Sequence, residues 1–351
     1  MQLHILLVED QPDQLDSMAL RLEGHLGCKI IKANNLEVGI DSFNKFMTTL
    51  DLVITDMHLG AKNPKGGLDM VKHIANKSFD YIPVIVLTAY AEVDNAADCM
   101  EAGAFSYVQK GDPNDTTFRK LCLTILRALE YRNSRLQVNG MASAICAMVD
   151  SHEPYTGGHS KRVGGYARIV ATKRGLSVAE QMIVWQAGLV HDLAKVGIGA
   201  DVLARPAKLS TLLMASIEAH PTEGYEMLKR VNANPAVAQA VLEHHKRIDG
   251  TGYPKDLTYK PSLVGQIVGL VDSFDAMTTP RPYMGGRGRD TFTAALNLLQ
   301  NDASNGMYDP TLVNCLNSGI QEIWDIFKSH VAKGWLPREL LDRNKADGRL
   351  S

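Results

Sequence analysis

Histidine and aspartate side chains are concentrated in the second half of the chain, within otherwise apolar sequence. Six of the 11 histidines lie between residues 152 and 245. Neutral imidazoles and carboxylates are good ligands for iron, manganese, nickel or zinc. Four histidines with one or two aspartates are too many for one tetrahedral zinc ion, but they suit two metal ions bridged by a carboxylate. The residues concerned are His191-Asp192, His220, His244-His245 and Asp272, with Asp275 one helical turn later.

For any one of these positions, the alternative is a core histidine that is satisfied by hydrogen bonds. The grouping argues against that alternative. His191 and Asp192 are adjacent after an apolar run, and burying both is costly unless another group compensates their polarity. Together with the adjacent pair His244-His245, they favour a metal centre.

In the first half of the chain, short β-branched runs end in polar residues. Glu9-Asp10, Asp56, Thr88 and Lys110 each follow such a run. Carboxylates that meet at one sheet edge repel one another unless a hard divalent cation such as Mg²⁺ lies among them. A hydroxyl and an ammonium beside them suit a phosphoryl group carried on one of the acids. Ordinary polarity of strand ends is the alternative for each residue alone, but the set together favours a phosphoacceptor site.

The elements that would position these acids alternate between strands and amphipathic helices over residues 1–125. This alternation predicts an α/β doubly wound, five-stranded parallel sheet, in which ligands bind at the carboxyl ends of the strands. Between strands, Leu15, Met18 and Leu22 recur at helical spacing. The predicted strands are Leu3–Val8, Lys29–Lys32, Leu52–Thr55, Val84–Leu87 and Phe105–Gln109.

From about Met141 onward the pattern is helical, which predicts an all-α bundle over residues 141–345. Apolar helices over Met182–Val190, Val237–Glu243 and Leu263–Val271 would carry the histidines and aspartates. Between the two halves, Thr117–Val138 predicts one helix that is longer than the first domain needs. This helix could pair with its copy in a homodimer, or it could be a plain surface helix.

Composition narrows the classes of protein. The net charge is −2, with 37 basic and 39 acidic residues, so no surface for polyanions is evident. No basic recognition helix is visible, which disfavours DNA binding. Apolar runs are too short to span a membrane, and the N-terminal one reaches Glu9 too soon for a signal peptide. The five cysteines include no Cys-x-x-Cys pair, so we expect a cytoplasmic protein without disulfides.

Residues 1–125 resemble the receiver domain of two-component response regulators. The resemblance implies that Asp56 accepts a phosphoryl group from a sensor histidine kinase and that Glu9 and Asp10, with Asp56, hold Mg²⁺. It also implies that Thr88 and Lys110 contact the phosphoryl oxygens and that Tyr107 is the aromatic switch residue. Two features depart from the family pattern: Gly111 replaces a proline after Lys110, and the loop Met57–Gly67 is lengthened.

Residues 141–345 resemble the HD-GYP domain, a branch of the HD phosphohydrolases that hydrolyses cyclic di-GMP. The motifs are His191-Asp192 with Lys195, and His244-His245 followed by Asp249-Gly250-Thr251-Gly252-Tyr253-Pro254. The resemblance implies a dinuclear site of iron or manganese, with nickel or zinc as alternatives, and Asp192 as the bridge. The implied metal ligands are His191, Asp192, His220, His244, His245 and Asp272.

The same resemblance assigns roles around the substrate. Lys195 would approach the scissile phosphate, and Arg281 would hold the second phosphate or a guanine edge. Asp249 and Tyr253 belong to a loop that would contact the substrate or other signalling proteins. Residues 117–140 form a helical linker that overlaps the last receiver helix. The implied activity is hydrolysis of cyclic di-GMP to pGpG, GMP or both, under the control of Asp56 phosphorylation.

Departures from the HD-GYP pattern leave two further hypotheses open. Tyr155 replaces a glutamate that helps to hold a third metal in some relatives, so we expect two metals and His159 behind them or facing the substrate. Met284 replaces a basic residue, and Lys246 replaces a glutamate. A catalytically weak protein that binds the dinucleotide or a partner is the first alternative, and an enzyme for another nucleotide is the second.

Overall fold

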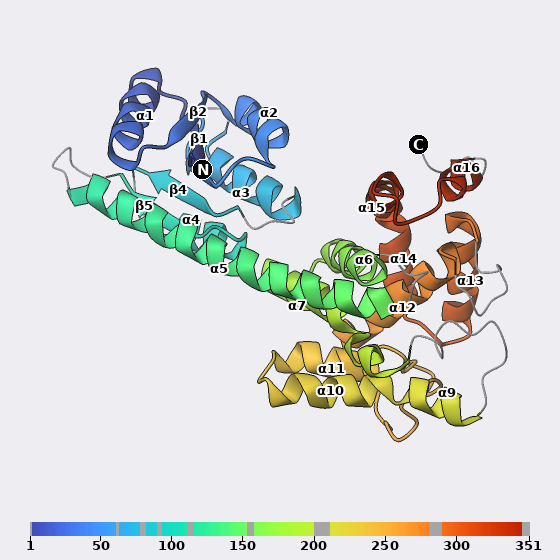
Figure 1. Cartoon of the computed structure of the whole chain (residues 1–351). Coiled ribbons are helices and arrows are strands. Elements are labelled where there is room, and N and C mark those ends of the chain that lie inside the picture. Colours follow the sequence, from blue (N-terminus) through green and yellow to red (C-terminus); the bar gives the residue numbers. More distant parts are fainter. Residues whose placement is uncertain are drawn as a thin grey trace. The chain divides into compact units, whose positions relative to one another are not determined.

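The chain forms two compact units, residues 1–139 and residues 140–351 (Figure 1). The computed structural model describes residues 2–60, 63–77, 82–89, 93–110, 116–152, 158–199, 211–280 and 290–345. Each unit has hydrophobic core clusters of its own. None of the helices in these ranges is long and apolar enough to cross a membrane.

The first unit contains a five-stranded sheet in the order β2-β1-β3-β4-β5, in which every strand pair is parallel. This topology confirms the predicted doubly wound sheet. Successive side chains of a strand face opposite sides of the sheet, and Leu6 and Leu7 accordingly belong to different core clusters. The strands are β1 (His4–Val8), β2 (Lys29–Ala33), β3 (Leu52–Asp56), β4 (Val84–Thr88) and β5 (Ser106–Gln109).

Helices cover both faces of this sheet. Leu22 of α1 and Ile125 of α5 pack on the face that contains Leu7, while Phe43 of α2 and Val71 of α3 pack on the opposite face. The helices are α1 (Pro12–Leu26), α2 (Leu36–Phe46), α3 (Gly66–Lys77), α4 (Val93–Glu101) and α5 (Thr116–His152).

Helix α5 is longer than the sequence predicted. The predicted end at Val138 was wrong, because the helix continues to His152 without interruption. Gly140 costs about 1 kcal/mol in a helix relative to alanine. The residues that follow, Met141, Ala142 and Ala144 among them, are good helix formers, so this cost does not end the helix.

The second unit is helical, as predicted, and the only pairing of strand type in its described part is the bridge between Lys246 and Gly252. Its elements are α6 (His159–Lys173), α7 (Val178–Val190), the 3₁₀ helix η1 (Leu193–Gly197), α9 (Thr211–Glu218), α10 (His220–Arg230), α11 (Pro235–Glu243), α12 (Leu263–Thr278), α13 (Phe292–Ser304), α14 (Pro310–Ser318), α15 (Ile320–Ala332) and α16 (Glu339–Lys345).

The central helix of this unit is α12, which packs against α6, α7 and α11. Its first turn is fixed by Ser262, whose side chain caps the helix by accepting a hydrogen bond from the Gly265 amide. Within the core, the ring of Phe292 contacts the rings of Phe274 and Trp324 edge to face. The packing of α12 brings Asp272 toward the ends of α7 and α11.

Candidate functional site

Helix ends position most of the candidate ligands in the second unit. His191 is the residue that terminates α7, and His244 is the residue that terminates α11. His220 is the first residue of α10, and Asp272 lies inside α12. All four residues are buried. These histidine and aspartate residues therefore form a polar centre in the interior of the helical unit.

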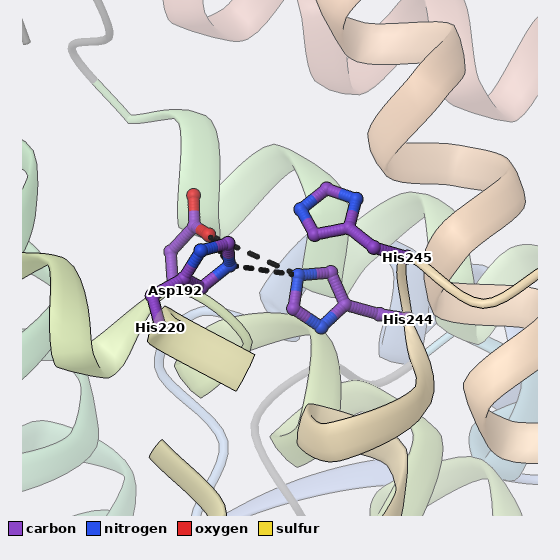
Figure 2. A group of neighbouring side chains, drawn as sticks. All are labelled: Asp192, His220, His244 and His245. Atoms are coloured by element: carbon purple, nitrogen blue, oxygen red, sulfur yellow. Dashed lines mark hydrogen bonds and ion pairs between the residues drawn. The ribbon is translucent and has the colours of Figure 1, made fainter. Parts of the chain in front are cut away.

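One group of side chains lies on one side of this centre. Donor atoms of Asp192, His220, His244 and His245 all lie within 4.8 Å of one another (Figure 2). The Nε2 atom of His220 lies 3.2 Å from Oδ1 of Asp192 and 3.2 Å from Nε2 of His244. The sequence assigned all four of these residues to the metal site, and the structure brings them together.

A second group lies beside the first and shares Asp192 with it. Donor atoms of His159, His191 and Asp192 also fall within 4.8 Å of one another. Oδ2 of Asp192 lies 3.3 Å from Nε2 of His191, while its Oδ1 faces His220. One carboxylate thus presents one oxygen to each group, which is the arrangement that a bridging ligand requires.

His159 faces the two acids of the second group. Its Nε2 atom lies 3.3 Å from Oδ1 of Asp272 and 3.7 Å from Oδ2 of Asp192. Its ring is turned toward both acids of the second group, which favours a ligand position over the expected place behind the metals or facing the substrate. A glutamate at position 155 is not needed for this orientation.

The histidine rings are oriented by hydrogen bonds on the side away from the centre. Nδ1 lies 2.9 Å from the Gly188 carbonyl in His191 and 2.7 Å from the Val241 carbonyl in His244. A carbonyl can only accept, so each Nδ1 carries a proton, and Nε2 is the ring atom that faces the acids. His220 has the same arrangement, since its Nδ1 lies 2.6 Å from the Ile217 carbonyl oxygen. Metal-binding histidines are oriented in the same way, by a hydrogen bond from the ring nitrogen that does not face the metal.

Burial and neighbouring charges set the protonation of the centre. Burial, the nearby imidazoles and in particular His245 lower the pKa of His244 well below its usual range. Burial alone would also lower the pKa of His191, but Asp192 and Asp272 raise it to about 9. Burial would raise the pKa of Asp192, but His191 and Lys195 hold it well below its usual range. The acids are ionised at neutral pH, as ligands must be.

The donors fit one or more transition metals. Nε2 of His191 and Oδ1 of Asp192 are buried and make no hydrogen bond within the described part of the chain. Buried polar atoms are nearly always satisfied, so such atoms indicate an additional partner at this point. Nitrogen and carboxylate donors together suit iron, manganese, nickel or zinc.

Asp275 contacts His159 on the side away from the centre and is paired with Arg162, a role that was not predicted from the sequence. Oδ2 of Asp275 lies 2.7 Å from Nδ1 of His159, and its Oδ1 accepts a hydrogen bond of 2.7 Å from Nε of Arg162. Burial alone would raise the pKa of Asp275, but Arg162 and His159 lower it far below its usual value. The available signal was spacing: Arg162 follows His159 by three residues, on the same helix face.

A glycine contact brings the two helices of the second group together. A Cβ atom on Gly188 of α7 would lie 2.8 Å from Cα of Gly164 on α6. Real Cβ atoms do not approach a backbone this closely, so only glycine permits the observed spacing of α6 and α7. The close crossing explains how His159, at the start of α6, reaches His191, at the end of α7.

Two of the residues predicted to face the substrate, Lys195 and Tyr253, lie beside the centre. Nζ of Lys195 lies 2.7 Å from Oδ2 of Asp192, and the ring of Tyr253 lies 4.5 Å from that of His245. Asp249 is exposed and accepts hydrogen bonds from Thr251. Arg281, Met284 and Tyr155, on which further predictions depend, lie outside the described residues, as does Gly111.

Lys246 has a structural role in the loop that follows the paired histidines. Its Nζ donates a hydrogen bond of 2.9 Å to the Gly250 carbonyl, and the residue is 5% exposed. Gly252 pairs with its backbone from the other side of the loop. The lysine therefore closes the loop that carries Tyr253, a role that a glutamate could not take, since a carboxylate cannot donate to a carbonyl.

In the first unit, the predicted acidic residues meet at the carboxyl end of the sheet. Carboxylate oxygens of Glu9, Asp10 and Asp56 lie within 4.8 Å of one another. Nζ of Lys110 lies 2.9 Å from Asp56 and 2.6 Å from Glu9. Burial raises the pKa of the Glu9 carboxyl, while Lys110 opposes the rise. A cluster with three carboxylates and one ammonium can hold a divalent cation beside a phosphorylated acid.

Thr88 and Tyr107 occupy the two neighbouring strands. Thr88 is the last residue of β4, and it is 1% exposed. Tyr107 lies in β5, and its hydroxyl is buried without a hydrogen-bond partner in the described part. Thr88 thus lies at the same sheet edge as Asp56. Tyr107 lies on β5, the strand next to the one that carries Thr88.

The comparisons with known proteins agree with both resemblances. Residues 5–120 match the response regulator receiver domain family, and residues 143–312 match the HD domain family. The chain therefore joins a receiver domain to an HD domain, as the sequence predicted.

Three curated relatives are similar in sequence to this chain. The chain is 26% identical to a cyclic di-GMP phosphodiesterase of Thermotoga maritima, with 92% of each chain covered. It is 28% identical to the cyclic di-GMP phosphodiesterase response regulator RpfG of Xanthomonas campestris pv. campestris, covering 79% of this chain and 77% of that protein. It is 33% identical to the 3′3′-cGAMP-specific phosphodiesterase 3 of Vibrio cholerae, over 41% of this chain and 31% of that protein.

Proposed function

We propose that the chain is a response regulator whose HD domain hydrolyses cyclic di-GMP at a dinuclear metal centre. The observation that carries the proposal is the position of Asp192, which offers one oxygen to each of two groups of donors. The relatives that match along most of the chain carry the name cyclic di-GMP phosphodiesterase. Iron or manganese fits the mixture of imidazole and carboxylate donors.

Each group of donors would hold one metal ion. His220, His244, His245 and Asp192 would bind the first ion, and His159, His191, Asp272 and Asp192 would bind the second. Two such ions supply a hydroxide nucleophile at neutral pH and neutralise charge on the phosphoryl oxygens.

The other residues of the site bind and orient the dinucleotide. Lys195 contributes an ammonium that can leave Asp192 to pair with a phosphoryl oxygen as negative charge builds there. Tyr253 presents a ring beside His245, next to which a sugar or base can pack. We infer that these contacts hold the phosphodiester in line with the attacking oxygen, and that the products are pGpG, GMP or both.

Turnover by the purified full chain tests this proposal. Cyclic di-GMP and 3′3′-cGAMP are supplied separately, the products are separated by chromatography, and the metals are measured by plasma mass spectrometry. We expect about two metal ions for each chain and faster hydrolysis of cyclic di-GMP. Binding of cyclic di-GMP without hydrolysis would favour the alternative of a dinucleotide-binding effector, and preferential hydrolysis of 3′3′-cGAMP would assign the enzyme another nucleotide.

Phosphorylation of Asp56 by a sensor histidine kinase is the proposed control of this activity, with Mg²⁺ held by Glu9, Asp10 and Asp56. Phosphorylation of Asp56 would break its ion pair with Lys110 and give Lys110 a phosphoryl oxygen instead. We expect Asp56→Ala to abolish any change in turnover caused by a small phosphodonor while basal turnover stays within about twofold, because Asp56 lies in the other unit. An Asp56→Ala protein that still responds would place the switch at another residue.

Pairing of two chains through α5 is a further part of the proposal. Val138, Met141, Ile145 and Met148 are between 42% and 69% exposed and follow the alternating spacing of three and four residues that coiled coils use. We expect the full chain to sediment as a dimer and Met141→Glu with Ile145→Glu to sediment as a monomer. A wild-type monomer at micromolar concentration would contradict this assignment.

A further inference from the structure

The last turns of α5 contact both helices that carry the second group of donors. Cys146 and Asp150 stand four residues apart, so they lie on the same face of α5. Asp150 contacts the start of α6, where His159 is located, and Cys146 contacts the end of α7, just before His191. One helix face thus contacts the two segments whose spacing sets the metal site.

Asp150 supplies the cap that α6 lacks. The residue at the cap position is Gly158, which has no side chain to satisfy the free amides of the first turn. Oδ2 of Asp150 accepts a hydrogen bond of 3.1 Å from the Gly158 amide, and Oδ1 accepts one of 2.9 Å from Oγ of Ser160. His159 lies between these two residues, so its backbone is held from both sides.

Cys146 makes the corresponding contact at the end of α7. It is 1% exposed, and its Sγ lies 2.8 Å from the Leu189 carbonyl, one of the carbonyls that the end of a helix leaves without an internal partner. His191 follows Leu189 by two residues. A displacement of α5 would therefore move His159 through the contacts of Asp150 and move His191 through the contact of Cys146.

The other end of α5 belongs to the receiver. Leu121 and Ile125, in its first turns, are fully buried members of the receiver core. We propose that Asp150 and Cys146 position the metal ligands His159 and His191, and that the receiver acts on the metal centre through these contacts. The assignment of ligands rests on the proposed function, while the contacts themselves do not.

Metal affinity is the direct measure of this positioning role. Apo protein is titrated with Co²⁺ in competition with a chelator, and the visible absorption of bound Co²⁺ reports both affinity and ligand geometry. We expect Asp150→Ala to lower Co²⁺ affinity by about 10- to 100-fold, the usual effect of losing a group that orients a ligand, and to change the absorption spectrum. Glu130→Ala, an exposed acid on the same helix, should leave affinity and spectrum unchanged.

A second variant separates positioning from general loss of structure. Ser160→Ala removes one hydrogen bond of Asp150 and keeps the rest of α6, so we expect a smaller loss of affinity and normal circular dichroism. The double variant should bind Co²⁺ no more weakly than Asp150→Ala alone, because both changes remove the same contact. Full additivity, or wild-type affinity and spectrum in Asp150→Ala, would overturn the positioning role.

Transmission from the receiver is tested with beryllofluoride, which mimics the phosphoryl group on Asp56. We expect it to shift the Co²⁺ affinity or spectrum of the wild type and to shift neither in Asp150→Ala. A wild-type centre that does not respond, or an Asp150→Ala centre that responds fully, would overturn the proposed route. No dinucleotide is used, so these results stand apart from the turnover assay: a chain that binds Co²⁺ as expected but hydrolyses no cyclic di-GMP would refute only the proposed reaction.

Discussion

Asp192→Ala should lower the metal content from about two ions for each chain to one or none and reduce hydrolysis of cyclic di-GMP by about 1,000-fold or more. The reason is that Asp192 is shared by both groups of donors, so its loss removes a ligand from each. Metal ions stabilise transition-state charge by several kcal/mol, and each 1.4 kcal/mol corresponds to a tenfold change in rate. Metal analysis and the initial rate are measured on the same preparation.

The control for this substitution is a second aspartate that has a structural role only. Asp309 caps α14 by accepting a hydrogen bond of 2.7 Å from the Thr311 amide, far along the sequence from any ligand. Asp309→Ala should cost about 1 kcal/mol of stability and leave the metal content at about two. If Asp192→Ala keeps both metals and its activity, the shared carboxylate is not the bridge.

The two ligand pairs could be recognised from the sequence because they are adjacent residues at the ends of strongly apolar helices. His191 and His244 each directly follow such a helix, and local sequence decides where a helix ends. Three strands of the receiver, β1, β3 and β4, were predictable for a similar reason: each is a short apolar run that ends in a polar residue or directly before one. In both cases the signal lies within a few consecutive residues.

The placement of His159 could not be read from the sequence, because it depends on contacts between distant segments. Its ring is turned by Asp275, which is 116 residues away along the chain. Gly164 and Gly188 then allow α6 and α7 to approach closely. Such contacts leave no periodic pattern, and glycine inside a helix normally signals only weak helix propensity. The continuation of α5 beyond Gly140 is different, because good helix formers directly after Gly140 account for it.

Arg162→Met should destabilise the HD unit by about 3–5 kcal/mol at pH 7, because it leaves the Asp275 carboxylate buried without its cation. Both side chains are almost completely buried, at 1% and 0% exposure. All three tryptophans, Trp185, Trp324 and Trp335, belong to the second unit. Unfolding in guanidinium chloride followed by tryptophan fluorescence, with a chelator present, therefore reports on this unit alone.

The pH dependence of this loss identifies Asp275 as its origin. In the wild type, burial would raise the pKa of Asp275, but Arg162 and His159 hold it below its ordinary value of 3.8, so the ionised carboxylate stabilises the fold above that pH. Without Arg162, burial raises the pKa of Asp275. Protonation of Asp275 then stabilises the folded state of the variant. The difference in stability between wild type and variant should therefore shrink as the pH falls from 7 to 5.

Two matched variants complete the measurement. Arg162→Met combined with Asp275→Asn carries no buried charge at this point and should recover most of the lost stability at pH 7. Lys173→Met breaks a partly exposed ion pair with Glu322 and should cost at most about 1 kcal/mol at either pH. A deficit in Arg162→Met that is the same at pH 5 and pH 7 would mean that Arg162 stabilises the unit by packing, and that the charge of Asp275 is compensated by other groups.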